Sequence, residues 1–373
     1  QDVRRPVDLI EEVARIWGYD RFPHTLIEEE LPPLRRNLAL EGEDQVRDIL
    51  VGLGLDEVIV YSLINPEDES RLNPGTFAEA PDRGIDLPGE PVVLRNALAP
   101  ERSQMRRTLL PGLLRTAWDN LRFLDRVMIF ELGHIHYKVG EPDLEAAETG
   151  IAEPRRLGIL LTGPRQGRWW DLTDREPMDY FDLKGIVEAL LSRLDLEPLG
   201  SAGVQWTRGK HPSFHPGRCA KVGLDDKALG YIGELHPLVG ETFDLPEQPI
   251  VLMEWDLDVL LEAARAAEAE KKLGWVSTYP QVHEDLALVV DESVPALEVQ
   301  RALLEIGAPL VTRVLLFDTY RGPQVGQGRK SLAFALTYQA PDRPLRDRDV
   351  EKLRKRLIKR IEQQVGAKLR GPQ

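Results

Sequence analysis

Apolar residues recur with a helical period near the start of the chain. In "VDLIEEVARIWG" (7–18) they fall three and four residues apart, which predicts an amphipathic helix that ends at Gly18. The next stretch, "TLIEEELPPLRRN" (25–37), has no such period and contains Pro32–Pro33, so it is predicted to be a linker. The pattern therefore places a first boundary shortly after the helix.

Between residues 41 and 260 the pattern is mixed. Short apolar runs typical of strands alternate with longer amphipathic stretches typical of helices, the first of them from about residue 41. Several strands follow one another without an intervening helix, which favours an antiparallel or mixed sheet over a doubly wound one. The predicted strands are 58–60, 91–98, 126–137, 155–163 and 250–261 with a hairpin over 219–237, and the predicted helices include 109–123 and 179–195.

The last hundred residues have the clearest pattern. A charged helical connector over 261–273 leads into six elements in the order βαββαβ, which is the ferredoxin-like arrangement. The predicted strands are 285–291, 311–322, 331–340 and 367–371, and the predicted helices are 295–307 and 348–366. The fold class is thus predicted to be α+β, with a mixed or antiparallel sheet module followed by a ferredoxin-like domain.

Composition and charge narrow the class of protein. The net charge is −14, which disfavours a chain that coats nucleic acid through bulk charge, but residues 277–373 carry sixteen basic and twelve acidic side chains, a balance of +4. The lone cysteine suits a reducing compartment, and neither a run of ~18 apolar residues nor a signal peptide is present, so we expect a cytoplasmic protein without a membrane span. Because the chain begins with Gln and enters a helix at once, we expect it to be a fragment of a longer protein.

Four acidic residues lie within the first twelve: Asp2, Asp8, Glu11 and Glu12. The last three are spaced i, i+3 and i+4, so a helix would direct them from one face, and oxygen ligands of this kind suit Mg²⁺. A helix cap is the alternative, with Asp8 at the N-cap and Glu11 at position N3. Spacing alone favours the cap.

Other candidate chemistry is weak. His211, His215 and Cys219 follow at four-residue intervals, as zinc ligands can, but prolines and a glycine break any helix there and a second cysteine is absent. We therefore interpret the stretch as a loop that enters a strand. The chain contains no P-loop, no Gly-x-Ser-x-Gly and no His-Glu-x-x-His motif, so no catalytic residue is predicted.

Basic and aromatic residues of the last domain are candidates for RNA contact. An exposed sheet that presents such side chains can stack unpaired bases and bind phosphates. Arg313 and Arg321 share strand parity and are expected to share a face. The Lys and Arg residues of the helix over 348–365 are interpreted as a solvated surface. The predicted RNA-binding residues are Arg313, Tyr320, Arg321, Arg329, Lys330 and Tyr338.

Several stretches carry a resemblance to one family. "DLIEEVARIWGYDRFP", "LRNALAPERSQMRRTLLPGLL", "FELGHIHY" and "HPGRCAKVGLDDKALGYIGELHP" resemble, in order, parts of the bacterial phenylalanyl-tRNA synthetase beta subunit. "YPQVHEDLALVVDESV" through "GAKLRG" resembles its anticodon-binding domain. The implied division is a remnant of a DNA-binding-like domain (1–30), a linker (31–40), a class II synthetase-like core without catalytic residues (41–260), a connector (261–276) and a ferredoxin-like domain (277–371).

The resemblance also implies activity, partners and cofactors. The family joins phenylalanine to its tRNA with ATP as an (αβ)₂ heterotetramer, ATP binds on the alpha subunit, and the last domain contacts the tRNA near the anticodon. A Mg²⁺ site shared with alpha follows the pattern Asp-x₅-Asp-x₂-Glu-Glu, which this chain matches with Asp2, Asp8, Glu11 and Glu12. We expect that site to be weak or empty in this chain alone. "HED" at 283–285 departs from the family, which often has basic residues before this Asp.

Two other functions fit the sequence less well. A freestanding nucleic-acid-binding or scaffold protein would use the first helix or the basic domain without a catalytic partner. A metal-dependent enzyme centred on the first acids lacks a recognisable base or nucleophile.

Overall fold

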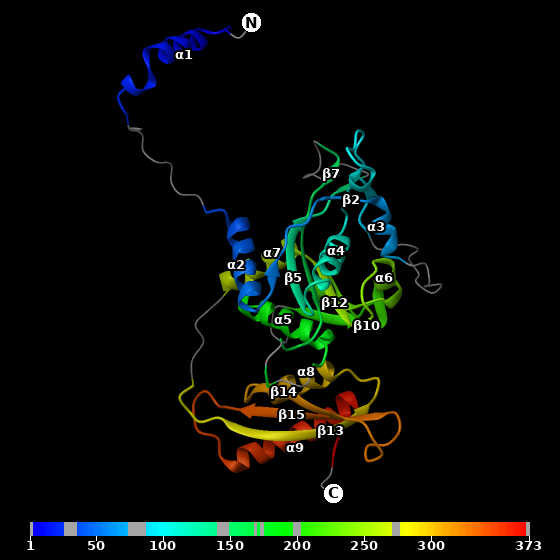
Figure 1. The fold of residues 1–373 in the computed structure, drawn as a ribbon. Coiled ribbons are helices and arrows are strands. Elements are labelled where there is room, and N and C mark those ends of the chain that lie inside the picture. The colour runs from blue at the N-terminus through cyan, green and yellow to red at the C-terminus, as the bar shows by residue number, and fades with distance from the viewer. Residues whose placement is uncertain are drawn as a thin grey trace. The chain divides into compact units, whose positions relative to one another are not determined.

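The computed structural model divides the chain into two units, residues 1–45 and 46–373, which are described separately (Figure 1). Among the residues described, no helix is long and apolar enough to span a membrane. The structure describes residues 3–25, 36–73, 87–139, 149–167, 170–171, 175–196, 203–270 and 277–370.

The first unit contains the predicted amphipathic helix, α1 (Pro6–Trp17), followed by a short 3₁₀ turn. Its N-cap is Arg5, so the prediction that Asp8 caps the helix is wrong. Proline at the first helical position presets φ and needs no N–H partner, which starts the helix three residues earlier than a cap at Asp8 would. Asp8 is therefore at position N3, and its Oδ2 accepts hydrogen bonds from the backbone N–H groups of Arg4 and Arg5, each at 2.8 Å.

A seven-stranded sheet forms the centre of the second unit, with strand order β1-β5-β8-β12-β11-β10-β9. The short β1 pairs in parallel with β5, and the other pairings within this sheet among the described residues are antiparallel, which confirms the expected mixed sheet. The strands are β1 (Asp56–Glu57), β5 (Val127–His134), β8 (Arg155–Thr162), β9 (Val204–Arg208), β10 (Phe214–Leu224), β11 (Lys227–Leu235) and β12 (Ile250–Asp256).

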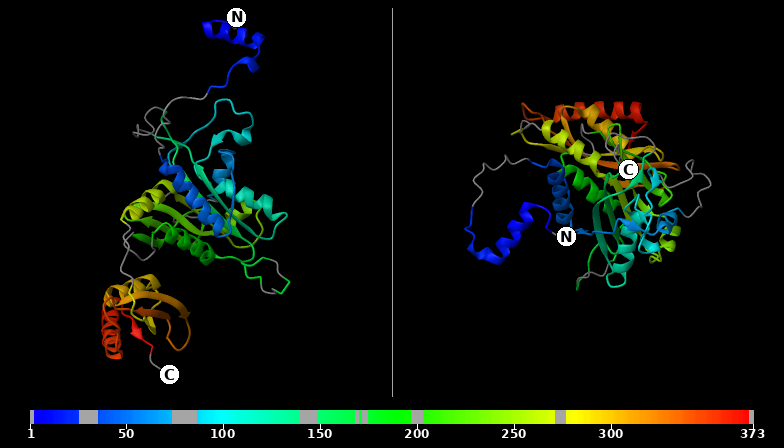
Figure 2. Two further views of the ribbon diagram at one scale, coloured as in Figure 1. Left: turned by 90° about the vertical axis from the view of Figure 1, so that its left-hand side faces the viewer. Right: turned by 90° about the horizontal axis from the view of Figure 1, so that it is seen from above.

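Helices cover this sheet on both faces (Figures 1 and 2). One face packs against residues 46–52 of α2 (Leu38–Gly52), α5 (Tyr180–Arg193) and α7 (Leu257–Glu270). The other packs against α4 (Leu110–Leu121) and α6 (Pro237–Thr242). Side chains of β12 alternate between the two cores, since Met253 and Trp255 enter the first core and Ile250 and Leu252 enter the second.

Smaller elements differ from the sequence prediction. Residues 58–60 are not a strand, and the strand predicted at 91–98 is reduced to β3 (Glu90–Pro91), because these β-branched runs lie at the sheet margin where few partners continue the ladder. The connector predicted to start at 261 begins as α7 at Leu257, whose side chain is buried. The remaining short elements are β2 (Leu63–Ile64), α3 (Pro66–Arg71), β4 (Gln104–Met105), β6 (Tyr137–Lys138) and β7 (Ile151–Ala152).

The C-terminal domain confirms the βαββαβ prediction. Its four strands are ordered β14-β15-β13-β16 and are antiparallel throughout, and two helices cover one face. The core is built from alternate residues of the strands and from Leu353, Leu357 and Ile361 of the last helix. The elements are β13 (Val282–Asp291), α8 (Ala296–Gly307), β14 (Val311–Tyr320), β15 (Arg329–Tyr338), α9 (Asp347–Val365) and β16 (Lys368–Leu369).

Candidate nucleic-acid interface

The face of the ferredoxin-like sheet opposite α8 and α9 is called the open face here. Strand β15 lies in the middle of the sheet and directs Leu332, Phe334 and Leu336 into the core. Its other side chains, including Ala333 and Ala335, therefore lie on the open face. Because these side chains are short, the middle of the open face is flat at backbone level.

Strand β14 supplies the predicted residues at one edge of the open face. Arg313 lies opposite Thr337 and is exposed, and Tyr320 lies opposite Ser331. The ladder shifts register between Leu316 and Asp318, and β14 ends at Tyr320, so strand parity does not carry through to Arg321. The prediction that Arg313 and Arg321 share a face by parity is therefore wrong, because a bulge changes the side on which later residues lie.

Tyr320 has a partner that the sequence prediction missed. The guanidinium carbon of Arg370 lies 4.9 Å from the centre of the Tyr320 ring. Arg370 also donates a hydrogen bond from Nη2 to Gln324 Oε1 at 2.5 Å, which fixes the guanidinium over the ring. These residues are fifty positions apart in the sequence, so local sequence pattern carried no signal for the contact.

Arg321 lies beside Glu292, with Nη2 and Oε1 2.8 Å apart. This hydrogen-bonded pair raises the pKa of Arg321 and lowers the pKa of Glu292. Both side chains are about half exposed, so the pair remains accessible to solvent. Arg329 is exposed and lies opposite Asp291 at the end of the β13–β15 ladder.

Two predicted contacts are wrong because their side chains are buried. Lys330 is only 9% exposed and donates from Nζ to the carbonyl of Glu292 at 2.9 Å. Tyr338 is 1% exposed, and its hydroxyl donates to Glu284 Oε2 at 2.9 Å; burial raises its pKa. Both residues have the parity of Leu332 and therefore point to the core side of β15.

Acidic side chains also lie on the open face. Asp285 and Asp318 are exposed and lie opposite Ala335 and Ala333 respectively. These two carboxylates give the middle of the face negative charge. Glu284 of the "HED" stretch instead lies on the core side of the sheet, where it accepts a hydrogen bond from the hydroxyl of Tyr338. A polyanion would meet the cations at the edges, Arg313 and Arg329, and avoid the middle.

The acidic residues near the start of the chain do not form a metal site in the described structure. Asp2 lies outside the described residues. Asp8 is hydrogen-bonded to the start of the helix, which lowers its pKa, and Glu12 pairs with Arg15 at 2.6 Å. Within the described part of the chain, no three His, Cys, Asp or Glu side chains gather in a way that could hold a metal ion. The arrangement of Asp8, Glu11 and Glu12 does not fit a bound Mg²⁺ without a further ligand.

The histidines and cysteine of the central module have structural partners. Nδ1 of His211 accepts from the N–H of Ser213, and Nδ1 of His215 accepts from the N–H of Gly217. Burial lowers the pKa of His211 to about 4 and raises the pKa of the Cys219 thiol to about 12. These contacts support the interpretation of a loop that enters a strand.

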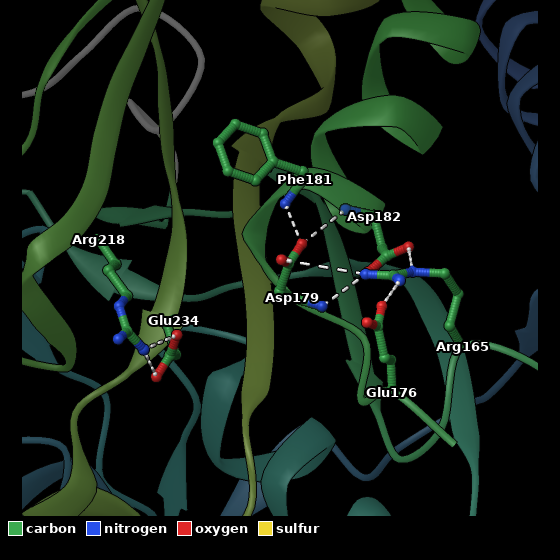
Figure 3. Close-up of polar contacts among 7 residues, drawn as sticks. All are labelled: Arg165, Glu176, Asp179, Phe181, Asp182, Arg218 and Glu234. Carbon is green, nitrogen blue, oxygen red and sulfur yellow. Dashed lines mark hydrogen bonds and ion pairs between the residues drawn. The ribbon is translucent and has the colours of Figure 1, made fainter. Parts of the chain in front are cut away.

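Charged groups near the start of α5 are paired with one another (Figure 3). Arg165 contacts Glu176 and Asp182, each at 2.7 Å, and Arg218 contacts Glu234 at 2.6 Å. Asp179 caps α5 by accepting from the backbone N–H of Phe181 at 2.8 Å, as an N-terminal aspartate does. These groups serve the fold and leave no acid–base pair for chemistry.

Comparison with known proteins adds two family matches. Residues 22–257 match the phenylalanyl tRNA synthetase beta chain CLM domain, and residues 277–370 match the ferredoxin-fold anticodon binding domain. The beta subunit of phenylalanine–tRNA ligase from Geobacillus kaustophilus is 35% identical over 372 residues, and that from Chromobacterium violaceum is 36% identical over 370. These alignments cover 100% and 99% of this chain but 43% and 42% of the relatives, so the chain spans less than half of their length.

A pyrrolysyl tRNA synthetase from Desulfitobacterium hafniense, PylSc, aligns at a TM-score of 0.42 with 15% identity, over 63% of this chain and 71% of that one. The two matched modules, in this order, define the class as an aminoacyl-tRNA synthetase subunit with an anticodon-binding domain. Within that class, the chain belongs to the phenylalanyl-tRNA synthetase beta chain family. The α+β fold class and the family resemblance noted from the sequence are confirmed.

Proposed function

We propose that this chain is the part of a phenylalanine–tRNA ligase beta subunit that packs on a catalytic alpha subunit and binds phenylalanine tRNA near the anticodon. The open face carries this proposal. It presents Arg313 and Arg329 at its edges and the ring of Tyr320 under Arg370, on a domain whose family is an anticodon-binding one. Arginines at such positions bind phosphates, and an accessible ring stacks an unpaired base.

The test compares two charge reversals in the complete protein that carries this chain. Arg313→Glu changes the open face, and Lys359→Glu changes an exposed position on α9, which covers the other face. We expect Arg313→Glu to lower tRNA affinity about tenfold and to reduce the salt slope by about one, while Lys359→Glu changes affinity much less. Equal effects of the two variants would place the tRNA on another surface.

The partner and the ATP-dependent reaction belong to the same proposal. The alpha subunit would bind ATP and hold the synthetic site, while this chain supplies a surface for alpha and for tRNA, with no catalytic residue of its own. Copurification with alpha in an (αβ)₂ complex, followed by aminoacylation with phenylalanine, tests partner and substrate together. A stable complex that charges a different amino acid would contradict the substrate but not the partner.

The Mg²⁺ site at Asp2, Asp8, Glu11 and Glu12 stays a prediction. Bound Mg²⁺ would neutralise carboxylates brought together at the start of α1, and in this chain Glu12 would first have to leave Arg15. We expect Mg²⁺ affinity to appear only when alpha adds a ligand. Tight Mg²⁺ binding by this chain alone in a titration would contradict that expectation.

A further inference from the structure

Two large apolar side chains of β14 lie on the open face, beside the predicted RNA contacts. Leu315 is 47% exposed and Phe317 is 54% exposed. Their neighbours Val314 and Leu316 pack against the core, so by alternation Leu315 and Phe317 point to the opposite side of the strand. Leu315 also lies opposite Ala335 in the ladder, which is an open-face residue of β15. We call Leu315, Phe317, Ala333 and Ala335 the apolar strip.

The bulge in β14 sets the position of Phe317. Leu316 pairs with Phe334 and Asp318 pairs with Ala333, so Phe317 is an extra residue without a partner of its own in the ladder. At such a bulge, two consecutive residues of one strand lie opposite a single residue of the next. Phe317 and Asp318 therefore both lie beside Ala333, whose methyl group covers little of the aromatic ring.

The Phe317 ring has no aromatic or cationic partner in the described part of the chain, whereas Tyr320 lies under the guanidinium of Arg370. Single exposed apolar residues are common on protein surfaces and need no explanation. Two large ones on the same face of one strand, next to the short side chains of Ala333 and Ala335, form a continuous apolar surface with polar residues around it. Such a surface is typical of an interaction site.

The charges around the apolar strip favour a nucleic acid as its ligand. Arg313 precedes the strip on β14, and Arg370 lies over Tyr320 at the other end. Asp318 and Asp285 lie beside the strip itself. Because carboxylates repel phosphates, a bound strand would direct its phosphates toward the arginines and its bases toward the apolar surface.

The spacing along β14 allows two separate stacking contacts. Phe317 and Tyr320 are three residues apart, and a strand rises about 3.3 Å per residue, so their Cα atoms are roughly 10 Å apart. Aromatic rings at this spacing can each take a base of their own. Stacking needs only the flat face of a base, so it does not require a particular nucleotide.

We propose that Phe317 stacks a second unpaired base of the bound tRNA, next to the base on Tyr320, so that β14 holds two nucleotides of the loop. The inference rests on the proposed function, because it requires tRNA to bind to the open face. It adds to the interface a residue that was not among the predicted contacts. It also commits the apolar strip to RNA, and a protein partner becomes an outcome that the test can detect.

The first measurement is the affinity of the complete protein that carries this chain for phenylalanine tRNA, by fluorescence anisotropy. We expect Phe317→Ala to weaken binding about tenfold, because one base loses its aromatic partner. Phe317→Tyr keeps a ring and should bind within about twofold of the wild type. Neither variant should change the salt slope, since no charge is altered. Phe181→Ala, which removes an exposed phenylalanine of α5 in the central module, is the matched control and should bind as the wild type does.

The second measurement identifies the base. Abasic nucleotides are placed one at a time in the anticodon loop, and each RNA is titrated with the wild type, Phe317→Ala and Tyr320→Ala. At the position that stacks on Phe317, removal of the base and removal of the ring should not add, because each change abolishes the same contact. A different position should show this behaviour with Tyr320→Ala. The same position for both variants, or no such position for Phe317→Ala, overturns the proposal.

The outcomes separate this inference from the proposed function. If Phe317→Ala binds tRNA as the wild type does while Arg313→Glu loses affinity, the open face binds tRNA but Phe317 stacks no base, and the inference alone is wrong. If neither variant loses affinity, the tRNA uses another surface and both proposals fail. If Phe317→Ala weakens assembly with alpha and leaves tRNA affinity unchanged, the apolar strip is a protein contact and the inference is again wrong.

Discussion

The central module and the ferredoxin-like domain each present part of an antiparallel sheet that no helix of the described chain packs against, yet the two surfaces differ. On the central sheet, α4 and α6 cover one end of the face and leave a recessed pocket whose floor contains Glu254. On the ferredoxin-like sheet, the helices lie on one side only, and the open face is flat at Ala333 and Ala335 with cations at its edges.

The comparison teaches that the size of the side chains on a sheet face, and the helices that pack beside it, decide what the face can bind. In the recess, Asp256 pairs with Arg156 and Glu254 accepts hydrogen bonds from Thr108 and Leu109, so its polar groups already have partners within the fold. A flat face with arginines at its edges suits a polyanion, because many weak phosphate contacts add up along its length. The secondary structure is nearly the same in the two regions and does not set this difference.

The largest expected effect is a loss of stability that differs between the two faces of the ferredoxin-like sheet. Phe334 is fully buried on the covered side, so Phe334→Ala should destabilise this domain by about 3–5 kcal/mol. Thr337→Ala, on the open face of the same strand, should change stability by less than about 0.5 kcal/mol. Calorimetric unfolding measures both. Similar losses would mean that the open face is a second packing surface.

The next effect concerns base stacking on the open face. Tyr320→Ala should weaken tRNA binding by about 1–3 kcal/mol, the range for loss of one stacked base. Tyr320→Phe keeps the ring and the contact with Arg370 and should retain most of the affinity. Fluorescence anisotropy with the cognate tRNA measures the pair. If the Phe variant loses as much as the Ala variant, the ring does not act by stacking.

A smaller effect is expected for the partly buried carboxylate of Glu254 on the central sheet. Because burial raises the pKa of Glu254, its contribution to stability is fully present below the unfolded pKa and is lost as pH rises through the folded pKa. Glu254→Gln does not titrate, so its stability relative to the wild type should rise with pH by on the order of 1 kcal/mol. Urea unfolding of both proteins at a series of pH values, from below to above the titration of Glu254, measures the difference in stability. Parallel curves of stability against pH for variant and wild type would contradict the prediction.

The smallest effect is expected at the exposed pair of Arg321 and Glu292. Both side chains are about half exposed, so Arg321→Ala should cost less than about 1 kcal/mol of stability. Its effect on tRNA affinity should nevertheless exceed its effect on stability if the guanidinium exchanges Glu292 for a phosphate. Thermal melts and binding titrations of the same preparation decide between a structural pair and a contact.

Pattern alone predicted the elements that are long and regular. The helix 348–366 and the strand 331–340 correspond to α9 and β15 within a few residues, because each buries one face over many turns or alternations. Short elements at the margins of the central sheet were predicted less well. Residues 58–60 have strand-forming side chains but lie outside any strand, since pairing requires a neighbour that sequence does not show.

The candidate sites show the same limit, because sequence does not show which residues become neighbours in the fold. Arg313 and Tyr320 could be chosen from composition, whereas Lys330 and Tyr338 were chosen without knowledge of which side of β15 faces the core. Arg370 was missed because β16 brings it to the sheet from a distant part of the chain. The pocket at Glu254 combines residues from several strands and from the segment before α4, so no local motif announces it.

The buried Cys219 has a practical consequence for experiments on these surfaces. Its thiol is 8% exposed and burial raises its pKa to about 12, so at neutral pH it offers almost no thiolate to an alkylating reagent. It is also the only cysteine of the chain. A cysteine introduced at a partly exposed position such as Thr337 would therefore be the site that a maleimide dye modifies first, which allows fluorescent labelling on the open face without removal of the native thiol.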